Sequence, residues 1–117
     1  MTRRTLTFSQ NADWRAGLRQ SARQAAGGRY VGEVLNFETP AQLFKRLTDK
    51  RWELVRLAQG KGALSVRELA RMAGRDVKRV HDDVVALAEL GVFERTDSGG
   101  VICPFESVHV DLLLESA

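Results

Sequence analysis

The segment from Ala63 to Leu90 constrains the fold most, because it encodes two short amphipathic helices separated by a glycine. Ser65 and Glu68 have the spacing of a capping box, in which each side chain binds a backbone N–H at the start of a helix. Apolar residues then follow at the helical period: Val66, Leu69, Ala70 and Ala73. Gly74 suits the left-handed conformation that ends a helix, so we predict that the first helix stops there.

The second helix of this segment is expected to begin near Asp76 and to end at Gly91. Its predicted buried stripe consists of Val77, Val80, Val84, Leu87 and Ala88. The neighbouring charged residues are off that stripe and are expected to face solvent: Arg75, Lys78, Arg79, Asp82 and Asp83. Cations in a first turn gain nothing from the helix dipole, but they are well placed for phosphates or base edges. The alternative is an ordinary solvated face, since nearby aspartates dilute the positive charge.

Two β-prone runs, 92–96 and 101–103, follow the second helix and flank the sequence Asp97-Ser98-Gly99-Gly100. This pattern predicts a β-hairpin. A helix-turn-helix followed directly by a hairpin is the winged-helix arrangement, in which the second helix enters the DNA major groove. Arg95 is the cation nearest the hairpin tip, so we expect a modest wing that contacts the DNA backbone at most. Cys103 is predicted to be a small buried hydrophobe.

Residues 64–95, LSVRELARMAGRDVKRVHDDVVALAELGVFER, resemble the winged helix-turn-helix of small prokaryotic predicted transcriptional regulators, broadly MarR- or ArsR-like. They are more similar to a group described as antitoxin-like or putative DNA-binding proteins, in which a phrase like LTDKRWELV, here residues 47–55, precedes the motif. The resemblance covers about residues 36–105 and implies DNA binding. The antitoxin version implies a toxin protein as partner and a complex that represses its own operon.

The remaining elements are expected on both sides of this segment. We predict strands at Leu6–Ser9, Tyr30–Phe37 and Ser107–Leu112, and helices at Ala12–Ala26, Pro40–Leu47 and Asp49–Gln59. The last of these helices is expected to bury Trp52, Val55 and Ala58, with Leu54 or Leu57 at its edges. The fold class is therefore α+β, divided into a strand-helix-strand extension (1–38), a winged helix-turn-helix (39–105) and a C-terminal strand and tail (106–117).

Composition favours a cytoplasmic protein without a cofactor. The chain has 117 residues, of which 28% are charged and 44% hydrophobic, and no apolar run approaches the length of a membrane span. We see no signal peptide, and one cysteine excludes an internal disulfide. One cysteine and two distant histidines do not form a zinc cluster or a nucleophile–base pair. Asp82 and Asp83 point about 100° apart on a helix, so they do not form a carboxylate pair, and we expect no enzyme activity.

The terminal segments suggest assembly. Residues 1–30 contain six arginines against one acid, Asp13, whereas residues 104–117 contain three acids and no Lys or Arg. This indicates either DNA contact by the first segment or complementarity between subunits. We predict a homodimer through the apolar side chains of the terminal strands: Leu6, Phe8, Val108, Val110 and Leu112, with Leu113 and Leu114 adding apolar surface. The alternative is that these strands pack on the chain's own helices.

Together these patterns predict a sequence-specific, double-stranded-DNA-binding transcriptional regulator. The candidate DNA-binding residues are Ser65, Arg67, Arg75, Lys78, Arg79, His81, Asp82 and Arg95. The pairs Lys45-Arg46 and Lys50-Arg51 precede the motif and belong either to a solvated face or to the edge of the phosphate contacts. The alternative function is a winged-helix protein-interaction module, toxin-neutralising or scaffolding, that binds no DNA.

Overall fold

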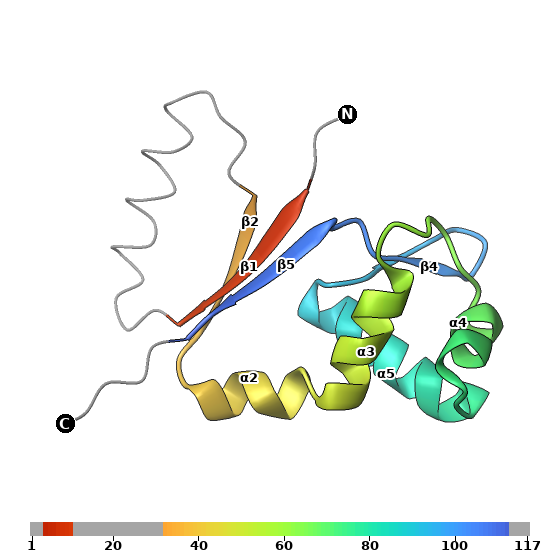
Figure 1. Cartoon of the computed structure of the whole chain (residues 1–117), viewed down its shortest axis with the longest axis horizontal. Helices are drawn as coiled ribbons and strands as arrows, with labels where there is room; N and C mark the ends of the chain where they lie inside the picture. Colours follow the sequence, from red (N-terminus) through yellow and green to blue (C-terminus); the bar gives the residue numbers. More distant parts are fainter. Residues whose placement is uncertain (1–3, 11–31, 113–117) are drawn as a thin grey trace. The chain divides into compact units, whose positions relative to one another are not determined.

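The computed structural model describes residues 4–10 and 32–112, and within them the protein is α+β, with four helices and two small sheets (Figure 1). The chain divides into unit 1, residues 1–43 and 107–117, and unit 2, residues 44–106. The helix predicted at Ala12–Ala26, the start of the strand predicted from Tyr30, and the Leu113-Leu114 pair lie outside the described residues. None of the described helices has the length and apolar character needed to cross a membrane.

Unit 1 contains a three-stranded parallel sheet, which confirms the positions predicted for three strands. β1 (Thr5–Gln10) is central, with β2 (Glu33–Phe37) on one side and β5 (Ser107–Asp111) on the other. The side chains alternate as a pleated strand requires: Leu6 and Phe8 are buried, and Val108 and Val110, opposite them in β5, are half-buried. The first and last strands of the described chain are therefore hydrogen-bonded neighbours.

Two capped helices follow the sheet strand β2. α2 (Pro40–Arg46) has Pro40 at its first position, and the Oγ1 of Thr39 accepts a hydrogen bond from Gln42 N at 3.3 Å. α3 (Asp49–Ala58) is capped by Thr48. α3 buries Leu54, Val55 and Ala58, but Trp52 is 41% exposed, so its predicted burial is wrong, as is the placement of Leu54 at an edge.

The two helices predicted between Ala63 and Leu90 are confirmed. α4 (Val66–Ala73) begins with the full capping box, in which Ser65 Oγ accepts from Glu68 N at 3.0 Å and Glu68 Oε1 accepts from Ser65 N at 3.3 Å. Gly74 ends α4 at φ 65°, a left-handed conformation that other residues adopt only with strain. After a short turn, Asp76 caps α5 (Val77–Leu90) by accepting from Arg79 N at 3.3 Å.

The buried face of α5 is narrower than its apolar pattern predicts. Val80, Val84 and Leu87 are buried, whereas Ala88 is half-buried and Val77 is 44% exposed. Val77 and Ala88 are eleven residues apart, which at about 100° per residue places them on the same edge of the helix. The prediction that Val77 is buried is wrong. Val77 lies at the edge of the stripe and is the first residue of α5.

A β-hairpin closes unit 2, as predicted. β3 (Glu94–Arg95) and β4 (Val101–Ile102) pair antiparallel, and Leu64 extends the pairing through two hydrogen bonds of 2.8 Å with Val101. Gly100 permits this approach, because a Cβ there would lie 2.7 Å from the Leu64 carbonyl oxygen. The hairpin segment buries Val92, Phe93, Val101, Cys103 and Phe105, which join the helices' apolar residues in the core of unit 2.

Candidate nucleic-acid interface

The start of α5 presents charged side chains that have no partner. Four of these side chains are exposed and form no hydrogen bond or ion pair with any residue that the structure describes: Lys78, Arg79, His81 and Asp82. The buried residues Val80, Val84 and Leu87 recur every three or four positions and form one stripe along α5. The charged side chains lie off this stripe. This surface is open to a ligand without any rearrangement of the core.

α4 and the hairpin supply the other predicted contacts. Arg67 is exposed in the first turn of α4, together with Ser65, whose hydroxyl oxygen already accepts the capping hydrogen bond. Arg71, which the sequence reasoning did not select, is exposed in the last turn of the same helix. Arg95 is exposed on β3, next to the glycine-containing hairpin tip.

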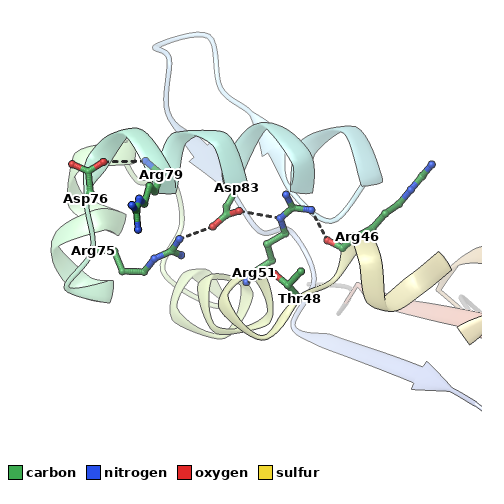
Figure 2. A network of polar contacts seen from close by, with 7 residues as sticks. All are labelled: Arg46, Thr48, Arg51, Arg75, Asp76, Arg79 and Asp83. Carbon is green, nitrogen blue, oxygen red and sulfur yellow. Dashed lines mark hydrogen bonds and ion pairs between the residues drawn. The ribbon is translucent and has the colours of Figure 1, made fainter. Parts of the chain in front are cut away.

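Arg75 and Asp83 differ from their prediction, because they do not face solvent freely. The side chains of Arg75 and Asp83 are only 19% and 15% exposed, and Arg75 Nη2 donates to Asp83 Oδ2 at 2.7 Å. The other carboxylate oxygen, Oδ1, accepts from Arg51 Nε at 3.0 Å, and Arg51 Nη1 donates to the Arg46 carbonyl at 2.8 Å. Figure 2 shows the two guanidinium groups reaching Asp83 from opposite sides, one from α3 and one from the turn before α5.

This shared carboxylate is held ionised. Partial burial by itself would raise the pKa of Asp83, but the hydrogen bonds and charges of Arg75 and then Arg51 outweigh that effect and hold its pKa below the ordinary value. The Asp83 carboxylate therefore joins α3 to α5 and fixes two guanidinium groups in one orientation.

A shallow hollow of about 280 Å³ lies over this network. Four cations and two carboxylates line it together with one hydroxyl side chain: Lys50, Arg51, Arg75, Arg79, Asp82, Asp83 and Thr48. Lys50 and Arg51 have no definite role in the sequence prediction, although the sequence contains one signal for Arg51. Arg51 precedes Val55 by four residues and Ala58 by seven, which places this cation in line with the buried face of α3 and predicts an internal partner.

A sequence profile of the family described as HVO_A0114 matches residues 46–110. This span is more than half of the chain. The chain belongs to the HVO_A0114 family. The part that matches the HVO_A0114 profile includes α3, α4, α5 and the hairpin, and therefore all the candidate DNA-binding residues and the hollow. No match to the chain is found among curated proteins.

In this HVO_A0114 family member, the residues predicted to form the dimer lie in or directly after the sheet of unit 1, away from the predicted DNA contacts in sequence. Leu6 and Phe8 are buried, Val108 and Val110 are half-buried, and Leu112 is 39% exposed. Leu112 follows β5, which is an edge strand of the described sheet. An edge strand offers unpaired backbone groups to a second copy, so Leu112 is the predicted dimer residue most available for such a contact.

Cys103 is a small buried hydrophobe, as predicted. Its thiol donates weakly to the Phe105 carbonyl at 3.6 Å, and burial raises the pKa of the Cys103 thiol. Within residues 4–10 and 32–112, no three potential His, Cys, Asp or Glu ligands come together to hold a metal ion.

Proposed function

We propose that this chain is a DNA-binding transcriptional regulator without catalytic activity, which acts as a winged helix-turn-helix and places α5 in the major groove. The observation that carries this proposal is a group of exposed side chains at the start of α5 that have no partner in the part of the chain that the structure describes: Lys78, Arg79 and His81. Buried residues on the opposite face fix the helix, and α4 and the hairpin flank it in the order that a winged helix requires.

The proposed contacts follow from exposure and chemistry. Lys78 and Arg79 contact bases or phosphates, with His81 and Asp82 as further base contacts. Val77 is an exposed apolar residue beside them and suits the methyl group of a thymine. Three further residues contact backbone phosphates, two from the start of α4 and one from the hairpin: Ser65, Arg67 and Arg95. Arg75 is held by its ion pair with Asp83, so we assign it a role in attracting DNA through its positive charge and not in contacting bases.

A homodimer is part of the proposal, because two-fold assembly lets one complex bind two half-sites about one helical turn apart. The edge strand β5 and the exposed Leu112 support the choice of interface. The antitoxin version adds a toxin protein bound by residues 1–38 or 106–117. Co-purification of the chain with the product of an adjacent small reading frame tests that version.

The test of DNA binding is a gel shift on the DNA upstream of the chain's own gene, at two salt concentrations. The double variant Lys78→Ala/Arg79→Ala should bind more weakly, and each lost phosphate contact should lower the slope of log affinity against log salt by about 0.9. A lost base contact should cost about 1–3 kcal/mol. The control is Arg56→Ala/Lys61→Ala, which removes the same charge from exposed positions elsewhere in unit 2. Equal affinity of the two folded variants would refute the role of α5.

A protein-interaction module that binds no DNA is the second candidate. It is favoured by two large exposed hydrophobic side chains of unit 2, Phe44 at 57% and Trp52 at 41%. Exposed aromatic residues are enriched in protein interfaces. Under this function, no duplex is bound even at low salt, and Trp52→Ala abolishes capture of the partner protein.

A further inference from the structure

We infer that the hollow lined by Thr48, Lys50, Arg51, Arg75, Arg79, Asp82 and Asp83 is a binding site for a phosphate group. This hollow, called the phosphate hollow below, involves α3 as well as α5. A phosphodiester of DNA and a free phosphate offer the same oxygens to it. For a DNA phosphate the inference rests on the proposed function and deepens it, whereas for free phosphate it stands independently.

The charges of the phosphate hollow favour an anion. Lys50, Arg51, Arg75 and Arg79 supply four positive charges from three parts of the chain, against the two carboxylates. One of those carboxylates, Asp83, is already neutralised by its ion pairs with Arg51 and Arg75. A net positive charge therefore remains for an incoming ligand. Lys50 and Arg79 contribute to it without an ion pair to any acid among residues 4–10 and 32–112.

The arginines of the phosphate hollow are also pre-organised. Arg51 is fixed by Asp83 and by the Arg46 carbonyl, and Arg75 is fixed by Asp83 (Figure 2). A guanidinium group has five N–H donors, so each arginine keeps donors beyond those that these bonds use. Fixing the side chains in advance reduces the entropy lost when a ligand binds.

One donor lacks an acceptor. Arg75 Nη1 is buried and has no hydrogen-bond partner in the described part of the chain. A buried donor without an acceptor costs free energy, and an ordered water or ion beside it is one way in which that cost is offset. Arg75 lines the phosphate hollow, so a phosphate held there would lie beside this guanidinium group.

The negative charge of Asp82 repels a phosphate bound in the phosphate hollow. Its carboxylate lines the phosphate hollow and has no partner among the described residues. Asp82→Asn removes the repulsion at nearly constant shape, so it should strengthen phosphate binding. Glu89→Gln is the matched control, because Glu89 is exposed on the same helix but does not line the phosphate hollow.

In the first arm, inorganic phosphate is titrated into the full chain at constant ionic strength set by chloride, and backbone amide shifts are followed by NMR. Saturable shifts are expected at residues 48–51 and 75–83. Lys50→Ala should weaken binding about two- to fivefold, the size of one exposed ion contact, and Asp82→Asn should strengthen it by a similar factor. Lys61→Ala, an exposed lysine outside the phosphate hollow, and Glu89→Gln should leave the affinity unchanged.

In the second arm, Lys50→Ala and Lys61→Ala are tested on duplex DNA. Lys50→Ala should lower the salt slope by about 0.9, whereas Lys61→Ala should not. If Lys50→Ala and Asp82→Asn change the phosphate affinity in the first arm as expected, the ligand is free phosphate. If only the salt slope on DNA changes, the ligand is a phosphodiester of the DNA backbone. If Lys50→Ala behaves as Lys61→Ala does in both arms, the inference is overturned. Phosphate binding without any DNA binding refutes the proposed function and leaves the phosphate hollow standing.

Discussion

The carboxylate of Asp83, shared by Arg51 and Arg75, joins α3 to α5 in unit 2, and Asp83→Asn removes its charge at nearly constant shape. Breaking a fully buried ion pair costs about 3–5 kcal/mol, and breaking an exposed one costs about 0–1 kcal/mol. The three side chains are 15–24% exposed, so water can rehydrate part of the network. We therefore expect the free energy of unfolding to fall by about 2–3 kcal/mol at pH 7, measured by urea denaturation.

The contribution of Asp83 to stability should also depend on pH. Because the pKa of Asp83 is lowered by folding, its contribution is present above the ordinary pKa of about 3.9 and is lost as the pH falls through the lowered value. The difference between wild type and Asp83→Asn should thus stay constant from pH 7 to about pH 5 and shrink as the pH falls below about 4. The control is Asp82→Asn, whose exposed carboxylate has no described partner and whose loss should change stability by less than about 0.5 kcal/mol. Equal stabilities of the two variants at pH 7, or a difference that does not change with pH, would refute the assigned role of Asp83.

Three further outcomes are expected. Leu87→Ala should lower the free energy of unfolding by about 2–5 kcal/mol, since Leu87 is 0% exposed between the helices of unit 2; a melting curve that does not move would contradict its place in the core. Leu112→Asp should convert the proposed dimer to a monomer in sedimentation velocity, while Asp111→Asn should not; a wild-type monomer at micromolar concentration would remove the dimer from the proposal. Cys103 should react slowly with a thiol reagent at pH 8 in the native protein and rapidly in urea, because burial suppresses its thiolate; equal rates would show that the site is open.

The elements that the sequence predicted correctly are those set by local chemistry. Three of these features depend only on residues within a few positions of one another, so the sequence alone is enough to predict them: the Ser65–Glu68 capping box, the left-handed Gly74 and the glycine-containing hairpin. The exposed row at Lys78 and Arg79 was also found, because helical periodicity separates it from the buried valines.

The errors arise where a partner distant in sequence decides the outcome. Asp83 was expected in solvent because nothing near it in sequence reveals that Arg51 meets it from another helix. Trp52 is predicted in the core because it precedes Val55 and Ala58 at helical spacing, whereas in the structure Arg51 occupies the position in line with these two residues. The parallel pairing of β1 with β5 was likewise not predictable, since alternation identifies a strand and not its neighbour.

The pairing of β1 with β5 also sets the order in which the protein can be completed during synthesis. Unit 2 is one continuous stretch of chain, whereas the sheet of unit 1 requires a strand from each side of it. When unit 2 leaves the ribosome, β1 still lacks β5, so one edge of β1 stays unpaired until β5 has been synthesised. An open strand edge invites pairing with other chains. Early folding of unit 2 shortens the flexible segment that must close to bring the two strands together, which lowers the entropic cost of that closure. The central, continuous unit thus acts as a folding aid for the discontinuous one.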